Sequence, residues 1–181
     1  MTEDTSMQSP GASFVGIFKR EDGEIKVAAC ESISQSGHLN YYSKLVGGTW
    51  LQKADGSFEN PREALMREVM EETGGDDAGR KGIVLIRKKK VYEEVIPDAL
   101  GNLHTRMFFF ALRWKGEISI PHPDPREESP AFWQSLYYFR RRLLPTHVDG
   151  FNAILEEACR RNEEFKSLLL EQRSFQSFCE G

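Results

Sequence analysis

The segment from Asn60 to Gly75 constrains the fold more than any other, because it has a marked beginning, a regular interior and a marked end. Asn60 suits a helix N-cap, Pro61 suits the first helical position, and Glu63 completes a capping box. The two final glycines supply a left-handed C-cap. The apolar residues recur at helical spacing: Leu65, Met66, Val69 and Met70. The segment therefore predicts an amphipathic helix whose apolar stripe packs against another layer.

Three glutamates of this predicted helix share one of its sides. Glu68, Glu71 and Glu72 lie at positions i, i+3 and i+4. Clustered carboxylates repel one another unless a cation neutralises them, and Mg²⁺ prefers carboxylate oxygens together with water and substrate phosphates. Glutamate also forms exposed helix readily. The spacing alone is compatible with a metal site and with an ordinary solvated helix face.

Strand-like segments flank the helix on both sides, and a helical region follows them. The predicted strands are 14–20 and 25–33, which form a hairpin around Asp22-Gly23, then 44–46, 82–86, 89–96 and 104–114. The chain has helical character from about Pro130 to Cys179. This order predicts an α/β (α+β) protein with mixed strand directions. We expect residues 1–12 to be a flexible tail and 13–181 to be a single domain with a helical C-terminal extension.

Composition argues against several functional classes. The longest apolar runs are far shorter than the roughly 18 residues that span a bilayer, so we expect no membrane helix. A net charge of −4 and a pI near 5.7 give no overall basic field for long nucleic acid. The four histidines lack the spacing of a zinc site. The polar N-terminus resembles no secretory signal, so we expect a cytoplasmic protein.

The helix and its approach resemble the Nudix box, whose pattern is Gly-x5-Glu-x7-Arg-Glu-apolar-x-Glu-Glu-x-Gly-apolar. Glu59 is followed by seven residues and then by the run Arg67 to Gly74, which fills every specified position from the first glutamate onward. The pattern departs upstream, because Lys53 stands where the family has its glycine. The nearest upstream glycines are Gly47 and Gly48, so the loop before Glu59 carries five extra residues.

The resemblance implies an α/β/α sandwich around a central mixed sheet. It also implies a hydrolase that cleaves a pyrophosphate bond in a nucleoside diphosphate linked to another moiety. Candidate substrates are a nucleoside triphosphate, a nucleotide sugar, ADP-ribose, a dinucleotide polyphosphate or a capped RNA end. The family uses Mg²⁺, for which Mn²⁺ can substitute, and its members often form homodimers. The alternative is a catalytically silent Nudix-fold module that binds a nucleotide for regulation.

The match assigns roles to individual residues. Glu68, Glu71 and Glu72 would be the metal ligands, and Glu68 could instead act as the general base. Arg67 would pair with a glutamate of the box, most plausibly Glu59. The backbone of Gly47 and Gly48 would let the loop approach the helix and the substrate.

Two further features have competing interpretations. Many family members draw another acidic residue from a later loop, and Glu128 is the candidate here, although it could equally be an ordinary surface glutamate. The basic run Arg87 to Lys90 could grip phosphates. Strand alternation would send half of these side chains to each face, so the run is also typical of an edge strand protected by lysines.

Overall fold

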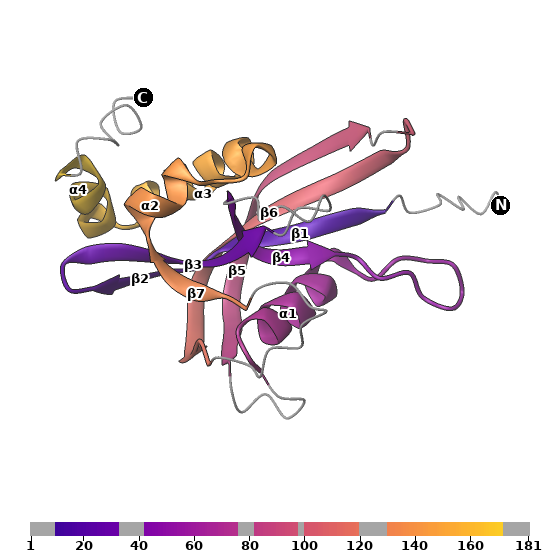
Figure 1. Cartoon of the computed structure of the whole chain (residues 1–181), viewed down its shortest axis with the longest axis horizontal. Coiled ribbons are helices and arrows are strands. Elements are labelled where there is room, and N and C mark those ends of the chain that lie inside the picture. The colour runs from indigo at the N-terminus through magenta and orange to yellow at the C-terminus, as the bar shows by residue number, and fades with distance from the viewer. Residues whose placement is uncertain (1–9, 33–41, 76–81, 98–99, 120–129, 172–181) are drawn as a thin grey trace.

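The structure, a computed structural model, describes residues 10–32, 42–75, 82–97, 100–119 and 130–171. A mixed sheet of seven strands lies between two helical layers (Figure 1). Strand order is β2-β3-β4-β1-β6-β5, and β7 pairs with β3 beside this path. The β1–β6 pair is parallel and the other pairs are antiparallel. The predicted fold class, a sandwich around a mixed sheet, is confirmed.

The bounds of the elements follow the chain in this order: β1 Gly11–Gly16, β2 Phe18–Glu21, β3 Glu24–Ser32, β4 Tyr42–Thr49, α1 Pro61–Glu72, β5 Gly82–Pro97, β6 Leu103–Glu117, β7 Phe132–Ser135, α2 Leu136–Arg141, the 3₁₀ turn Pro145–His147, α3 Val148–Arg161 and α4 Glu163–Glu171. None of the helices within the described ranges combines the length and apolar character needed to cross a bilayer.

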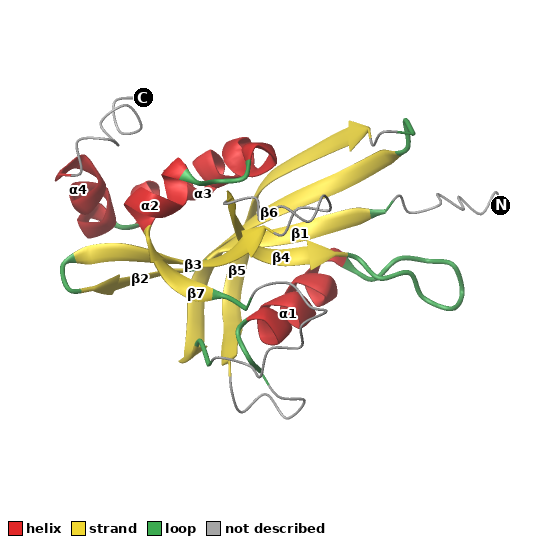
Figure 2. Cartoon of the chain, in the orientation of Figure 1, coloured by secondary structure: helices red, strands yellow, loops and turns green. Residues whose placement is uncertain are grey.

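The two faces of the sheet carry separate cores. Leu65 and Val69 of α1 pack on one face, against Val15, Val46 and Phe109. The other face packs against α2, α3 and α4 through Phe139, Phe151, Ile154, Leu155 and Leu169. Strand β6 lies between β1 and β5, and both Phe108 and Phe109 are buried, one in each core. The helices in Figure 2 accordingly lie on both sides of the strands.

Three strand predictions need correction. The first predicted hairpin strand is divided into β1, which pairs with β4 and β6, and β2, which pairs with β3. The turn itself is as expected, because Asp22 and Gly23 both have positive φ, as a type I′ turn requires. The predicted strands 82–86 and 89–96 are one continuous strand, β5. Residues 132–135 form β7, although the sequence predicted helix there, because they pair with β3.

Candidate active site

Helix α1 is held in place by the local signals that predicted it. The side chain of Asn60 accepts a hydrogen bond from the Arg62 amide at 2.9 Å, and Pro61 is the first helical residue. Gly74 follows the helix with φ of +83°. Because Leu65 and Val69 are buried against the sheet, the rotation of the helix turns Arg67 away from it. The helix therefore presents its charged side beside the end of β4.

Arg67 joins the acidic residues of this side into one cluster. Its Nε and Nη2 donate to the two carboxylate oxygens of Glu59 at 3.1 and 2.9 Å, which is a bidentate pair. Its Nη1 donates to Glu68 Oε1 at 2.8 Å and to Glu71 Oε2 at 3.1 Å. Its Nη2 also reaches the Thr49 carbonyl at 3.0 Å, which ties the helix to the end of β4. The expected Arg67–Glu59 pairing is present.

The longer loop before Glu59 forms a small hairpin of its own. Gln52 and Phe58 form an isolated β-bridge, and Asp55 accepts hydrogen bonds from the amide and hydroxyl of Ser57. At its base, the Glu59 amide donates to the Leu51 carbonyl at 2.8 Å. The two ends of the longer loop therefore lie side by side. The extra residues do not displace Glu59, whose carboxylate still pairs with Arg67.

The two glycines near the end of β4 are required by close contacts rather than by loop flexibility. Gly47 has φ of +135°, and a Cβ on it would lie 2.1 Å from the Ser13 carbonyl oxygen. A Cβ on Gly48 would lie 2.5 Å from Cδ of Glu68. The carboxylate of Glu68 thus rests directly against the Gly48 backbone.

Glu72 takes a different direction from the other two glutamates. Its side chain is 7% exposed, and its Oε2 accepts a hydrogen bond from the Gly47 amide at 2.7 Å. Its Oε1 forms an ion pair with Nζ of Lys44 at 3.1 Å. The Lys44 ammonium also lies 3.5 Å from the Gly47 carbonyl oxygen. Sequence reasoning missed Lys44, and the available signal was a lysine inside the otherwise apolar approach to the glycine pair.

The environment separates these carboxylates electrostatically. Partial burial raises the pKa of Glu68, and the neighbouring Arg67 opposes that effect. Hydrogen bonds from Arg67 lower the pKa of Glu59, so that carboxylate is held ionised. Burial thus opposes the ionisation of Glu68, whereas Arg67 favours that of Glu59.

Solved structures share this architecture, although no family model and no curated protein sequence matches the chain. The MutT Nudix hydrolase of Burkholderia pseudomallei is 19% identical with a TM-score of 0.56, over 81% of this chain and 98% of that one. The ORF135 protein of E. coli is 20% identical with a TM-score of 0.56, over 83% and 93%. The NUDIX domain of Shewanella oneidensis NrtR, solved in complex with ADP ribose, is 17% identical with a TM-score of 0.54, over 83% and 86%. This chain has the Nudix fold. The resemblance seen in the sequence is thus confirmed at the level of the fold.

The predicted metal ligands of this Nudix fold meet only in part. Within the described part of the chain, no group of three His, Cys, Asp or Glu side chains could hold a metal ion. Glu68 and Glu71 do converge, since one oxygen of each contacts the same Nη1 of Arg67. In this structure the positive charge between the two carboxylates is the Arg67 guanidinium. Two carboxylate oxygens so placed suit a hard divalent ion that also binds phosphate. Glu72 is directed to Lys44 instead, so its assignment as a ligand stays a prediction.

The additional acidic residue expected in Nudix proteins is not located. Glu128 lies outside the described residues, and its role stays a prediction. The site that the structure does define consists of Glu59, Arg67, Glu68 and Glu71 beside Gly48.

Proposed function

We propose that this protein is a divalent-metal-dependent Nudix hydrolase that cleaves a pyrophosphate bond in a nucleoside diphosphate linked to another moiety. The observation that carries the proposal is the convergence of Glu68 and Glu71 on one guanidinium nitrogen, directly beside Gly48, in a chain with the Nudix fold. The Nudix neighbours support the hydrolase, and the candidate substrates are nucleoside triphosphates, nucleotide sugars, ADP-ribose and dinucleotide polyphosphates.

The residues of the cluster have distinct tasks in this proposal. Glu68 and Glu71 would hold Mg²⁺ or Mn²⁺, with Glu72 as the third predicted ligand. Such an ion neutralises phosphate oxygens and lowers the pKa of an attacking water. Arg67 fixes the orientation of both carboxylates, and Glu59 holds the guanidinium in place through its bidentate pair. The bare backbone of Gly48 leaves the room in which the Glu68 carboxylate lies.

A purified-protein assay tests the proposal. A panel of nucleoside triphosphates, nucleotide sugars, ADP-ribose, dinucleotide polyphosphates and capped RNA would be incubated with Mg²⁺ or Mn²⁺, and in parallel with EDTA, and the products identified by mass. We expect cleavage within the pyrophosphate bridge that EDTA abolishes. Cleavage that persists in EDTA would contradict the metal-dependent mechanism.

Glu68→Gln is expected to lower kcat/KM by at least about 100-fold, because it removes the charge of a ligand while keeping its shape. The matched control is Glu156→Gln, the same change on an exposed side chain of α3, which packs on the opposite face of the sheet from α1. That control should hydrolyse the substrate as the wild type does. Equal activity of Glu68→Gln and wild type would remove Glu68 from the mechanism.

Gly48→Ala is expected to lower kcat/KM by roughly tenfold or more while leaving the fold intact. The added methyl group would lie 2.5 Å from Cδ of Glu68, so the carboxylate must move, and a flexible side chain can do this without unfolding the protein. Kinetics and thermal melting would be measured on the same preparation. Unchanged hydrolysis would show that the position of the Glu68 carboxylate does not matter.

The second candidate is a regulatory module that binds a nucleotide without cleaving it. One observation favours it: Glu72 of the Nudix box forms a buried ion pair with Lys44 rather than joining Glu68 and Glu71. In addition, the NrtR domain in the comparison was solved with ADP ribose bound. This candidate predicts that ADP-ribose raises the melting temperature and is recovered uncleaved in the presence of Mg²⁺ or Mn²⁺.

A further inference from the structure

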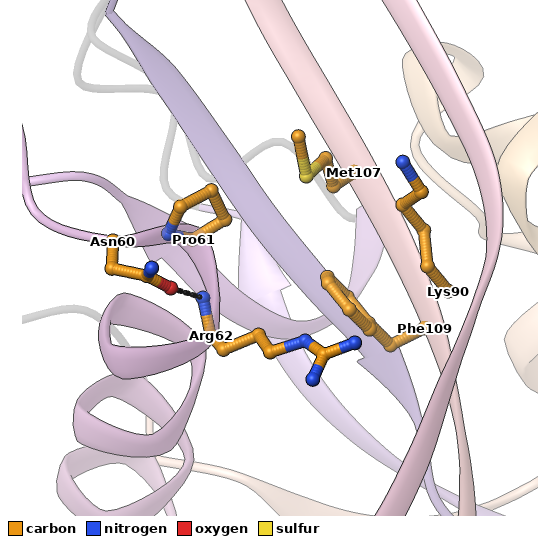
Figure 3. A pocket seen from close by; sticks show the side chains of 6 residues that line it. All are labelled: Asn60, Pro61, Arg62, Lys90, Met107 and Phe109. Atoms are coloured by element: carbon orange, nitrogen blue, oxygen red, sulfur yellow. Dashed lines mark hydrogen bonds between the residues drawn. The ribbon is translucent and has the colours of Figure 1, made fainter.

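A second concave site lies on the other flank of α1. Its volume is about 410 Å³, and its walls are Asn60, Pro61 and Arg62 of the helix start, Lys90 of β5, and Met107 and Phe109 of β6 (Figure 3). In the sheet, β5 and β6 are separated by β1 from β4, where Gly48 contacts Glu68. The pocket is therefore distinct from the carboxylate cluster.

Strand alternation divides the basic run of β5 between the two faces of the sheet. Lys90 lines the pocket, and Lys88 lies on the same face because no register shift separates the two. Lys89 points to the opposite face, where it pairs with Glu157 of α3. The basic run from Arg87 to Lys90 thus places Lys88 and Lys90 on the face of the sheet that α1 covers. On the opposite face, Lys89 forms an ion pair with α3.

The positive charge around the pocket is only partly compensated. Lys90 pairs with Glu93. Arg62 and Lys88 form no ion pair with any acidic residue that the structure describes, and burial together with the nearby Arg62 lowers the pKa of Lys88. The first amide of the helix is already bonded to Asn60, so the charge available to a ligand is that of side chains. Two neighbouring cations that pair with no described carboxylate favour the binding of an anion beside them.

The floor of the pocket is apolar. Met107 and Phe109 are the residues of β6 that line the pocket. The Arg62 side chain extends toward Phe109 in Figure 3. A volume of about 410 Å³ lies within the range of small-molecule sites. A floor of this kind suits the organic part of a ligand whose phosphate lies among the cations.

We propose that this pocket binds an organic monophosphate of nucleotide size. Its phosphate lies at the Arg62 guanidinium of the pocket wall, which offers paired donors to phosphate oxygens, and Lys88 on the same face of β5 adds a second positive charge nearby. Its ring lies over Met107 and Phe109. The proposal goes beyond the hydrolase and does not depend on it, because neither metal nor the glutamates of α1 take part.

Isothermal titration in EDTA tests the pocket without metal-dependent binding at the carboxylates. The probes are AMP, adenosine and inorganic phosphate. We expect the wild type to bind AMP roughly tenfold more tightly than either of the others, because only AMP uses both the cations and the floor. The double variant Arg62→Gln/Lys88→Gln should lose about tenfold in AMP affinity and bind AMP no better than adenosine.

Two controls isolate the effect. Lys115→Gln removes one positive charge from β6 at the end that pairs with Val84, away from the pocket, and should bind AMP as the wild type does. Glu68→Gln should also bind AMP normally, so failure of the hydrolase and failure of the pocket are distinguishable. Thermal melting confirms that each variant is folded. The proposal is overturned if the wild type shows no preference for AMP over adenosine and phosphate, or if Lys115→Gln loses as much affinity as the double variant.

Discussion

Lys44→Met is expected to lower the free energy of unfolding by about 3–5 kcal/mol, because it leaves a buried carboxylate without its cation. The side chains of Lys44 and Glu72 are 10% and 7% exposed, and their charged atoms lie 3.1 Å apart between β4 and α1. Methionine keeps the length of the lysine stem and fills the same space. The loss is thus assigned to charge rather than to a cavity. Urea denaturation at neutral pH measures it.

The partner substitution provides the internal test of this assignment. In Lys44→Met/Glu72→Gln the charge of both partners is gone, while the amide oxygen still accepts the hydrogen bond that the Gly47 amide donates to Glu72 Oε2. The double variant should be more stable than Lys44→Met alone. Lys115→Met, the same change at an exposed lysine, should shift stability by less than about 0.5 kcal/mol. A loss at Lys44 no larger than this would show that the pair is not needed for stability.

The parts of the fold that the sequence predicted correctly carry their signals locally. Both ends of helix α1 are specified by nearby residues, the start by Asn60 and Pro61 and the end by the glycines that follow it. Each of these signals acts over only a few residues of sequence. The Asp22-Gly23 turn is specified by the same kind of short-range preference. Such short-range features can therefore be predicted without knowledge of the tertiary structure.

The parts that were missed depend on contacts far apart in the chain. β7 is a strand because Val27 and Gln134 are paired in its register with β3. Its four residues run directly into α2, so no local signal separates strand from helix. Long-range pairing of this kind is a property of the assembled sheet rather than of the segment.

The site shows the same division. The Nudix pattern predicted the Arg67–Glu59 pair, because that pattern already contains the geometry of one helix and its approach. Helical spacing placed Glu68, Glu71 and Glu72 on one side, yet about 100° per residue spreads them over an arc wide enough to reach both solvent and sheet. Which of them turns inward depends on how α1 lies on β4. Lys44 meets Glu72 only because of that packing.

Mild acid is expected to destabilise the protein at pH values above the ordinary pKa of a carboxyl group, because His147 resists protonation in the fold. Its side chain is buried with 3% exposure, and its Nδ1 accepts a hydrogen bond from the Leu45 amide at 3.4 Å. Its ring centroid lies 4.2 Å from that of Phe14. Burial, together with the positive charges of Lys44 and Arg106, lowers the pKa of His147 from 6.5 to about 3.

The direction of the pH effect follows from this depressed pKa. In the unfolded chain His147 binds a proton near pH 6.5, whereas the folded protein resists protonation until about pH 3. The contribution to stability is therefore complete above pH 6.5 and is lost as the pH falls toward 3. Each pH unit in that window costs about 1.4 kcal/mol, so roughly 2 kcal/mol is lost by pH 5.

His147→Asn separates this effect from general acid sensitivity. Asparagine retains a hydrogen-bond acceptor for the Leu45 amide but cannot take up a proton in this range. The variant should be less stable than the wild type at pH 7.5, because the ring no longer fills its place beside Phe14, yet its stability should stay nearly constant down to pH 5. Glu157, whose pKa is lowered to about 2, loses its contribution only as the pH falls below about 4.5, which is outside the measured range of pH 7.5 to 5. Urea denaturation at half-unit steps from pH 7.5 to 5 gives the slope, and a variant that kept the wild-type slope would mean that the proton is taken up elsewhere.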